Sequence, residues 1–575
     1  MRSITEQFFK NASHLADAPC WKYWSEGKWI TSSWQQVADK VKALSYGLTR
    51  QGLKKGDRVC IVAPNSHHWV VADLAILSIG CVTVPVYPHL SNANIESIIR
   101  DSGAKLIFAE DDKILRRISS NHRVVMFKEG KSDNALFYEK LLCEEKTSLP
   151  EIFPEDIATI VYTSGTTGEP RGVVLTHRNI SSEIDAVKSV YNFSAEKTGL
   201  LCIPLSHVLG RLLEFYQLSQ GCRLAFNRGI DQLASDYLVL QPHFSCVVPR
   251  MLEKIYERVF EWRASQHIII QKLIDFSLKI GREHFELLRG GSRSGARIYL
   301  ENLLAQNLLF KKLRSRLGGN LEAIICGGAT LDPEIAEFFH IVGLPVFEGY
   351  GLTETFAAVS VNRPDDFHLG SVGKPVEGAE IKIAPDHEIL IKGPMVFSGY
   401  WNDGKFKRDS FDDEGWYHTG DLGSFMWNGF LKIEGRKKDV FVTAAGKNIV
   451  PSYLEVMLTR NRFIEQAFIY GDGRKYLVAL ITMNRSAVFD YLKKKYATTS
   501  ILENNRLEDL PSVKNLFSNI IEEINKGLAR HETIKKYHLV SEPFSLENDS
   551  MTYTQKLKRD KILERYHKEL EKLYL

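Results

Sequence analysis

Residues 158–172 read ATIVYTSGTTGEPRG, and this stretch is the most informative part of the chain. Its apolar, partly β-branched start predicts a buried strand. The strand runs into a loop of small hydroxyl residues and glycines, with the cation Arg171 near its end. Such a loop can present backbone N–H groups, hydroxyls and a positive charge to a polyphosphate, because glycine lets the backbone approach closely. No lysine follows Gly168, so the loop is not a GxxxxGK[ST] motif. A surface turn is the plain alternative, but the length and order of the pattern favour phosphate binding.

The segments on either side of this loop alternate between two periodicities. We expect a helix over 34–51 and strands over 58–63, 82–86 and 105–109. Residues 70–87 are the most apolar stretch, but they include Asp73 and are too short to span a membrane, so they predict a buried helix entering a buried strand. This alternation predicts an α/β fold with mostly parallel sheets covered by helices.

The second half of the chain changes character. Residues 251–315 contain no proline and predict a helical insertion that is almost continuous apart from a Gly/Ser break at 290–295. Short alternating runs at 380–384 and 388–392 predict a smaller, more antiparallel β unit.

A further change near Lys438 predicts a linker between two domains. The first would span 1–437. The second, 438–575, would be a small α+β domain ending in a charged helix over 556–575.

Composition excludes several classes of protein. Apolar residues make up 44% of the 575 residues, which excludes a disordered chain. The net charge is +4 and no block of basic residues occurs, so nucleic-acid binding has no support. The eight cysteines form no CxxC pair and no Cys/His cluster, which disfavours a zinc site or a disulfide scaffold. The N-terminus lacks the apolar core of a signal peptide. We therefore expect a cytoplasmic protein, with peripheral membrane contact left open.

The loop resembles the signature YTSGTTGxPKGV of the adenylate-forming (AMP-binding) superfamily, which includes acyl-CoA synthetases, firefly luciferase and peptide-synthetase adenylation domains. The resemblance extends over about residues 30–570. It implies that the ATP phosphates are bound by Thr163, Ser164, Gly165, Thr166, Thr167, Gly168 and Arg171, with Thr166 also near Mg²⁺. Arg171 stands where lysine is usual, so the charge is retained but a rigid planar fork replaces a point charge.

Residues 349–354, GYGLTE, resemble the YGxTE motif of this superfamily. The resemblance implies that Tyr350 stacks on adenine beside Gly351, that Thr353 meets the α-phosphate, and that Glu354 helps to hold Mg²⁺. Magnesium prefers oxygen ligands, often one carboxylate plus phosphates. Taken alone, Glu354 would more often be a solvated or capping acid.

Residues 325–330, ICGGAT, are similar to the superfamily's SGGAPL segment, which lies against adenine and the acyl site. Gly328 and Ala329 would take that place. Cys326 replaces the usual serine. The sequence suggests no histidine partner for this thiol, so we expect it to be buried and inert.

Two more motifs follow. WYHTGD at 416–421 matches WxxTGD, which implies that Asp421 binds the ribose hydroxyls. GRKKD at 435–439 matches GRxxD, which implies that Arg436 contacts ribose and phosphate and that Lys438 is a hinge. The loop at 443–451 resembles the one that lines the pantetheine channel, with Gly446 close to that chain.

Residues 552–559, TYTQKLKR, resemble the segment LTPTLKLKR that carries the adenylation lysine in long-chain members. Lys556 aligns with that lysine, and Lys558 is the alternative. Tyr553 and Gln555 depart from the pattern. On composition alone, Lys556 would be one solvated charge among many.

Three segments resemble the long-chain acyl-CoA synthetase branch. They are 203–208 (IPLSHV, compared with PLSHxxER), 247–258 (VVPRMLEKIYER) and 276–283 (FSLKIGRE). His207 would lie by the acyl carboxylate, although a lone histidine is more often structural. Gly210 replaces the usual glutamate.

The resemblance thus implies a long-chain fatty acid–CoA ligase that uses ATP, Mg²⁺ and CoA. Its substrate would form acyl-AMP, and rotation of the C-terminal domain about Lys438 would then admit the thiol. An acyl-[acyl carrier protein] ligase is the nearest alternative. An acyl-adenylate-forming enzyme that does not use CoA is disfavoured, because such relatives carry an insertion after the YGxTE segment. Here only about 15 residues separate Glu354 from Gly370. Arg171, Gln555 and Gly210 keep open a non-catalytic scaffold that binds nucleotide or acyl chains.

Overall fold

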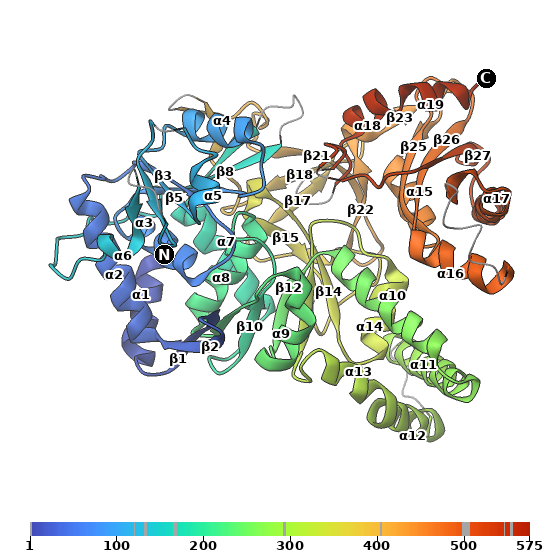
Figure 1. The fold of residues 1–575 in the computed structure, drawn as a ribbon, viewed down its shortest axis with the longest axis horizontal. Helices are drawn as coiled ribbons and strands as arrows, with labels where there is room; N and C mark the ends of the chain where they lie inside the picture. The colour runs from blue at the N-terminus through green and yellow to red at the C-terminus, as the bar shows by residue number, and fades with distance from the viewer. Residues whose placement is uncertain are drawn as a thin grey trace. The chain divides into compact units, whose positions relative to one another are not determined.

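The computed structural model describes residues 3–119, 121–130, 135–164, 170–290, 295–402, 405–496, 507–545, 547–551 and 556–575. The chain divides into two compact units (Figure 1), each treated by itself. The larger unit consists of Met1–Lys382, Leu390–His418 and Met426–Leu431, and the smaller one of Ile383–Ile389, Thr419–Phe425 and Lys432–Leu575.

The first sheet of the larger unit has nine strands. They are β1 (Pro19–Ser25), β2 (Lys28–Ser33), β10 (Thr198–Leu201), β11 (Arg223–Phe226), β12 (Phe244–Val247), β13 (Ala323–Cys326), β14 (Val346–Leu352), β15 (Ala357–Val361) and β16 (Lys374–Pro375). Their order is β16-β15-β14-β13-β12-β10-β11-β1-β2. The pairs from β1 through β14 are parallel, while β2, β15 and β16 add antiparallel strands at the two edges.

The second sheet also has nine strands. They are β3 (Arg58–Val62), β4 (Val82–Val86), β5 (Leu106–Ala109), β6 (Val124–Met126), β7 (Leu136–Phe137), β8 (Ile157–Ser164), β9 (Pro170–Thr176), β19 (Gly399–Asn402) and β20 (Lys405–Lys407). Their order is β20-β19-β9-β8-β4-β3-β5-β6-β7. The pairs from β7 to β8 are parallel, whereas β8, β9, β19 and β20 pair antiparallel. Both sheets confirm the predicted α/β class.

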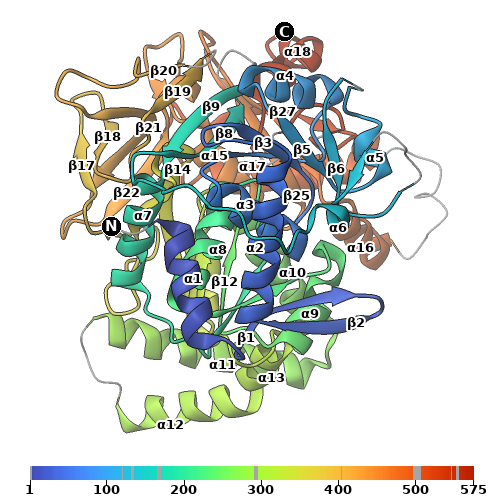
Figure 2. The same cartoon turned by 90° about the vertical axis from the view of Figure 1, so that its left-hand side faces the viewer.

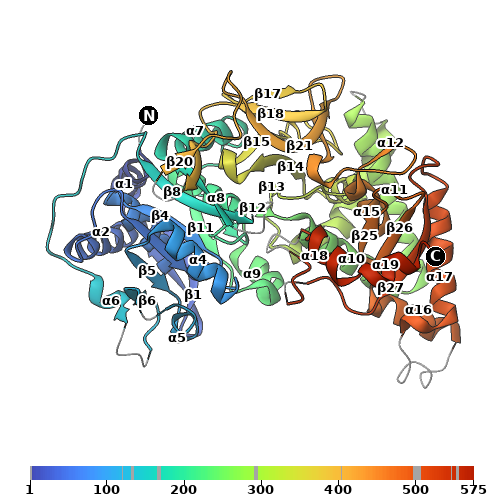
Figure 3. The same cartoon turned by 90° about the horizontal axis from the view of Figure 1, so that it is seen from above.

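Buried helices fill the space between the two sheets. Helices α3 (His67–Ser78) and α8 (Val208–Gln220) are almost wholly buried, in one apolar core with strands of both sheets. The expected helix over 34–51 is α2 (Trp34–Arg50), and the apolar stretch at 70–87 is α3 followed by β4. Figure 3 shows α4 (Asn92–Ser102) beside β5; its isoleucines pack on the outer face of the second sheet. The other described α-helices of the larger unit, outside the insertion, are α1 (Ile4–Leu15), α5 (Asp112–Leu115), α6 (Tyr138–Leu141), α7 (His177–Val190), α9 (Leu233–Leu240) and α14 (Pro333–Ile341).

The helical insertion has one more break than the sequence predicts. It consists of α10 (Pro249–Ser265), α11 (Ile268–Arg289), α12 (Ala296–Ala305) and α13 (Lys311–Arg316), with a π-helical turn at Gln306–Phe310. The additional break lies at Gln266, whose backbone is extended, and at His267, whose side chain accepts the N–H of Ile269 and so caps α11. In Figure 2, α12 lies at the lower edge of the larger unit, below α11.

The smaller unit is built on a three-stranded sheet. This sheet has the order β25 (Ile464–Tyr470), β26 (Leu477–Met483), β27 (Ile534–Val540). Around it lie the hairpin β23 (Phe441–Val442) and β24 (Asn448–Ile449) and the helices α15 (Pro451–Thr459), α16 (Arg485–Tyr496), α17 (Pro511–Asn525), α18 (Arg559–Arg565) and α19 (His567–Lys572). A separate four-stranded sheet has the order β17 (Glu380–Ile383), β18 (Glu388–Lys392), β21 (Tyr417–Phe425), β22 (Leu431–Arg436).

The prediction of one C-terminal helix over 556–575 is wrong in its extent. The helix begins at Arg559 and is divided by Tyr566, which has left the helical conformation at φ −109° and ψ 20°. Leu557 instead forms an isolated antiparallel bridge with Met551, which prevents an earlier start. In the part of the chain that the structure describes, no helix combines the length and the apolar character that crossing a membrane requires.

Candidate active site

The predicted phosphate loop connects the antiparallel strands β8 and β9. Thr163 pairs with Arg171 across this hairpin, and Ser164 pairs with Pro170. The Thr163 hydroxyl donates to the Arg171 carbonyl oxygen at 3.5 Å. Four predicted phosphate ligands lie outside the described residues: Gly165, Thr166, Thr167 and Gly168. The structure therefore places the two ends of the loop.

Tyr400, which the sequence analysis did not single out, connects two of the predicted site residues. The Arg171 guanidinium lies over the Tyr400 ring, 3.9 Å from its centroid. The Tyr400 hydroxyl donates to Glu354 Oε1 at 2.7 Å and lies 3.3 Å from the Tyr417 hydroxyl. Burial and the nearby Glu354 carboxylate raise the pKa of Tyr400, so its hydroxyl keeps its proton and remains a donor. The planar guanidinium of arginine suits this stacking better than a lysine ammonium would.

A sharp turn after β14 presents Thr353 and Glu354. Phe356 and Ala357 adopt φ values of +48° and +99°, a left-handed conformation that is costly for residues with a β-carbon. The turn is held because Phe356 is fully buried and because Gly351 lets the chain fold back. A β-carbon at Gly351 would lie 1.2 Å from the Ala357 carbonyl oxygen. Thr353 and Glu354 remain half-exposed.

Glu348 is a second residue that the motifs do not reveal. It precedes the GYGLTE segment on β14 and is buried, which raises the pKa of its carboxyl group to about 8. It accepts hydrogen bonds from the backbone N–H groups of Leu331 and Gly370. Glu348 therefore fixes the end of the loop that begins after β13. An acid inside the otherwise apolar run LPVFEGY at 344–350 was the signal available in the sequence.

The loop after β13 carries Gly328 and Ala329, both exposed. Gly328 has φ +87°, a conformation that glycine adopts without strain. The neighbouring Cys326 is buried, as expected, and burial raises the pKa of its thiol. Tyr350, on the adjacent strand β14, is buried, with 9% of its surface exposed.

His207 caps helix α8 and is half-buried. Its Nδ1 accepts the N–H of Leu209 at 3.1 Å, so a neutral ring carries its proton on Nε2. Three residues later, a β-carbon at Gly210 would lie 2.3 Å from the Pro204 carbonyl oxygen. This backbone therefore accepts glycine where the long-chain pattern has glutamate.

A buried ion pair anchors the strand that leads into the phosphate loop. Arg211 on α8 donates to both carboxylate oxygens of Asp73 on α3, with a shortest distance of 2.7 Å, and both side chains are inaccessible to solvent. Arg211 Nη1 also donates to the Thr159 hydroxyl of β8 at 2.7 Å. Two helices and the strand are thereby joined behind the loop.

The other predicted residues belong to the smaller unit. Asp421 on β21 is buried, and its Oδ1 pairs with Arg436 Nε at 2.9 Å. Lys438 is exposed in a 3-10 turn, Lys437–Asp439. Gly446 has φ +72° in the turn between β23 and β24, and a β-carbon there would meet no atom within 4 Å.

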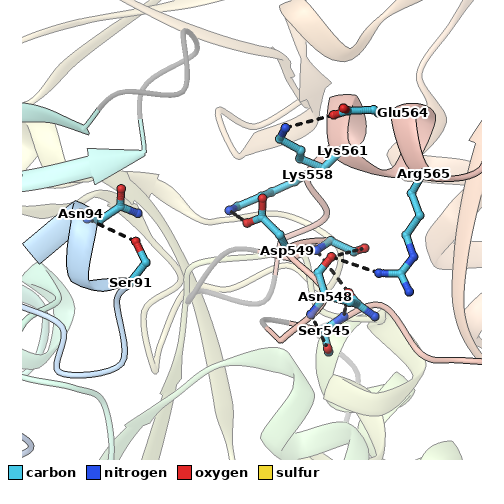
Figure 4. A network of polar contacts seen from close by, with 10 residues as sticks. Ser91, Asn94, Ser545, Asn548, Asp549, Lys558, Lys561, Glu564 and Arg565 are labelled. Carbon is cyan, nitrogen blue, oxygen red and sulfur yellow. Dashed lines mark hydrogen bonds and ion pairs between the residues drawn. The ribbon is translucent and has the colours of Figure 1, made fainter. Parts of the chain in front are cut away.

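Lys556 is exposed and precedes α18 in the chain. Figure 4 shows Asn548 and Asp549, which belong to a compact turn before it. The alternative lysine, Lys558, forms an ion pair with Asp549 of that turn. Asn548 organises the turn through Ser545, whose N–H donates to Asn548 Oδ1 at 3.0 Å. Arg565 donates to the Asn548 carbonyl oxygen at 3.4 Å. Lys558 is thus committed to this network.

The predicted site has few carboxylates, which suits a metal ion that is bound together with the phosphates of ATP. Among the described residues, no group of three or more His, Cys, Asp or Glu side chains could hold a metal ion. Glu354 can offer one carboxylate, and Mg²⁺ commonly takes one or two carboxylates plus substrate phosphates. The donor set fits magnesium bound as MgATP.

Comparison with known proteins identifies the family. Residues 8–401 match the profile described as AMP-binding enzyme, and residues 438–575 match AMP-binding enzyme C-terminal domain. The chain belongs to the AMP-binding enzyme family.

Curated relatives of this AMP-binding enzyme align over nearly its whole length. Long-chain-fatty-acid–CoA ligase FadD15 of Mycobacterium bovis is 32% identical over 571 residues, covering 96% of this chain and 93% of the relative. Long chain acyl-CoA synthetase 7, peroxisomal, of Arabidopsis thaliana is 30% identical, covering 96% and 82%. Long-chain-fatty-acid–CoA ligase 1 of Homo sapiens is 29% identical, covering 95% and 82%.

Solved structures share the fold at lower identity. The adenylation domain of a carboxylate reductase from Mycobacterium chelonae has a TM-score of 0.76 at 20% identity, covering 100% of this chain and 91% of that one. The o-succinylbenzoate CoA synthetase of Bacillus subtilis, in complex with ATP and magnesium ion, has a TM-score of 0.68 at 20% identity, covering 96% and 98%. The anthranilate CoA ligase AuaEII has a TM-score of 0.73 at 18% identity, covering 98% and 97%.

Proposed function

We propose that this enzyme activates a long-chain fatty acid with MgATP and transfers the acyl group to CoA, releasing pyrophosphate and AMP. One observation carries the proposal. Relatives from bacteria, plants and animals named long-chain-fatty-acid–CoA ligase or long chain acyl-CoA synthetase align with almost the entire chain.

In the first half-reaction, a carboxylate oxygen of the fatty acid attacks the α-phosphorus of ATP. The bond from that phosphorus to the bridging oxygen breaks, and pyrophosphate leaves. The residues of the larger unit that act here are the loop 163–168, Arg171, Thr353 and Glu354. The stack of Arg171 on Tyr400 and the Tyr400–Glu354 hydrogen bond support this assignment, because they fix a cation and a carboxylate before ATP arrives.

Nucleotide recognition uses both units. Tyr350 and Gly351 lie against adenine, with Gly328 and Ala329 between adenine and the acyl carboxylate, and His207 at that carboxylate. Asp421 accepts the ribose hydroxyls, and Arg436 reaches ribose and phosphate. The pairing of Asp421 with Arg436 supports these roles, since it orients the carboxylate.

Lys556 of the smaller unit offsets the charge that develops on the transferring phosphate. Its alignment with the lysine of the LTPTLKLKR segment supports this choice, and its side chain is exposed.

In the second half-reaction, residues 438–575 rotate about Lys438, so that the loop carrying Gly446 lines the pantetheine channel. The CoA sulfur attacks the acyl carbonyl carbon, the bond to AMP breaks, and AMP leaves. Two observations support this boundary and its motion. The C-terminal profile match begins at residue 438, and Lys438 lies exposed in a short turn. One site can thereby assemble two sets of groups in turn.

The test is AMP release from the purified chain with MgATP and palmitate, with and without CoA. We expect CoA-dependent AMP release and equimolar palmitoyl-CoA. Replacement of CoA by holo-acyl carrier protein is the control for the acceptor. Absence of AMP and of ATP–pyrophosphate exchange with acids of every length would contradict an enzymatic role.

A further inference from the structure

Helix α11 exposes large apolar side chains along one face. Ile269, Leu273 and Phe276 are 70%, 56% and 50% exposed. Their spacing of four and three residues places them on one side of the helix. The residues with which α11 packs inward are different ones, such as Ile274 and Gly281. The exposed side chains are therefore not required to attach the helix.

Helix α12 exposes a second set. Leu300, Leu303 and Leu304 are 57%, 45% and 60% exposed, while Asn302 and Ala305 on the opposite side are buried. Figures 1 and 2 both show α12 at the outer edge of the larger unit, next to α11. Single exposed apolar residues are common on proteins, but three on one side of each of two adjacent helices exceed such scattered exposure, and exposed apolar patches mark interaction surfaces.

The same segment carries a concentrated positive charge. Residues 249–316 contain fourteen Lys and Arg against seven Asp and Glu, whereas the whole chain has a net charge of only +4. Some of the acids are neutralised within the segment, because Asp275 pairs with Arg263 and Glu301 pairs with Arg297. Exposed cations include Lys272, Lys279, Lys311, Lys312 and Arg316.

We propose that the exposed face of α11 and α12 docks onto an anionic lipid bilayer. Apolar side chains would enter the boundary between headgroups and acyl chains, and the surrounding cations would meet lipid phosphates. Helices that lie in a bilayer surface combine these two features. A second copy of the chain is a poorer occupant, because it would bring an equally positive segment against this one.

The docking site rests on exposure and charge. Its use in taking a fatty acid from the bilayer rests on the proposed function as well. The experiment therefore measures binding and catalysis separately.

The test is flotation of the full chain with vesicles of equimolar phosphatidylcholine and phosphatidylglycerol, and with vesicles of phosphatidylcholine alone. We expect flotation with the anionic vesicles that weakens as salt is added. The triple variant Leu300→Gln, Leu303→Gln, Leu304→Gln should lower partitioning about tenfold or more, because apolar area is lost from the interface. The triple variant Lys311→Gln, Lys312→Gln, Arg316→Gln should lose about fivefold per removed cation on anionic vesicles only.

A matched control replaces three exposed apolar residues elsewhere in the larger unit. These are Phe153, Ile230 and Trp427, which are 50%, 68% and 81% exposed, each changed to Gln. This control should float like the wild-type chain. Thermal melting followed by circular dichroism verifies that each variant is folded.

Two results would overturn the proposal. One is a wild-type chain that does not float with anionic vesicles, or a folded leucine variant that floats equally well. The other is a wild-type dimer in sedimentation that the leucine variant converts to monomer while vesicle binding is absent, which would assign the face to self-association. AMP release with palmitate dispersed in neutral detergent, without vesicles, should be unchanged in all three variants. Its absence from the wild-type chain would count against the proposed function and leave the docking result standing.

Discussion

Tyr400 uses its two ends for different purposes. Its ring supports the Arg171 guanidinium, and its hydroxyl holds Glu354 at 2.7 Å. The residue that replaces the usual lysine and the carboxylate proposed for magnesium are therefore positioned by one side chain. No motif quoted from the sequence includes Tyr400, because its role depends on β19 lying beside β9 in the sheet.

Changing Tyr400 to Phe should separate these two purposes. The stack on Arg171 remains, while Glu354 loses a charge-assisted hydrogen bond worth about 1.5–3 kcal/mol. We expect kcat/KM for MgATP to fall by about tenfold or more, with half-saturation by Mg²⁺ moving to higher concentration. Steady-state kinetics across a magnesium titration measures both. Tyr417→Phe, which leaves the Tyr400–Glu354 bond in place, is the comparison and should change the magnesium titration less. An unaltered magnesium dependence in Tyr400→Phe would refute the positioning role.

At the scale of elements, the turn after β14 depends on a glycine with no room for a side chain. Gly351→Ala would place a β-carbon 1.2 Å from the Ala357 carbonyl oxygen, so the turn bearing Thr353 and Glu354 must open. We expect the free energy of unfolding to fall by about 3 kcal/mol or more, beyond the usual range for overpacking. Gly429→Ala is the control, since Gly429 has φ +83° but open space around it, and should cost only about 1–2 kcal/mol. Urea denaturation measures the free energy of unfolding of both variants. Equal losses in Gly351→Ala and Gly429→Ala would show that the backbone relieves the contact with Ala357 and would contradict the prediction.

Helix α14 and strand β14 are joined by His340, which is sensitive to pH. Its Nε2 donates to the Val346 carbonyl oxygen at 2.8 Å, and its ring stacks on Phe367. Burial lowers the pKa of His340 to about 4. The neutral form is therefore favoured in the folded chain. Its contribution to stability is complete above the unfolded pKa of about 6.5 and is lost as pH falls from there towards 4.

His340→Gln should therefore flatten the dependence of stability on pH. Between pH 7 and 5, we expect the variant to lose less of its unfolding free energy than the wild-type chain, by up to about 2 kcal/mol. Thermal and urea unfolding across this range give the comparison. His14 on the exposed side of α1 is a suitable control position, and His14→Gln should leave the slope as it is. A slope in His340→Gln as steep as in the wild-type chain would contradict the assignment.

Local pattern was sufficient to predict those elements whose periodicity is strong. The strand at 82–86 and the helix beginning at Trp34 are found where expected, because apolar spacing and a serine cap define them locally. The break at 266–267 and the division of the C-terminal helix were not predicted. Each depends on a local backbone departure, at Gln266 and at Tyr566. The late start of the C-terminal helix depends on the bridge between Met551 and Leu557. The role of Glu348 was not predicted either, because its hydrogen-bond partners Leu331 and Gly370 are distant from it in sequence.

For the whole molecule, the proposed reaction requires groups from both units. Thr353 and Glu354 belong to the larger unit, and Lys556 belongs to the smaller one. The sequence motifs predict which residues contact the nucleotide. Whether residues of both units contact it at the same time depends on how the two units move.

Replacing Lys556 with Ala tests this dependence. We expect ATP–pyrophosphate exchange to fall about a hundredfold or more, because a charge that stabilises the transition state is removed. Thioester formation from supplied acyl-AMP and CoA should continue near the wild-type rate. Lys558→Ala, which breaks only the pair with Asp549, should retain exchange. If Lys558→Ala lost ATP–pyrophosphate exchange while Lys556→Ala retained it, Lys558 would be the adenylation lysine instead of Lys556.

The buried triad of Arg211, Asp73 and Thr159 has a consequence for how this enzyme can diverge. It ties β8 to two helices from behind, at full burial, so losing one charged partner would cost about 3–5 kcal/mol. Arg171, on β9, is not a member of this triad, so a change at 171 can alter the phosphate contact while the triad still holds β8. Evolution can thus alter the nucleotide contacts of this enzyme independently of the scaffold that supports them.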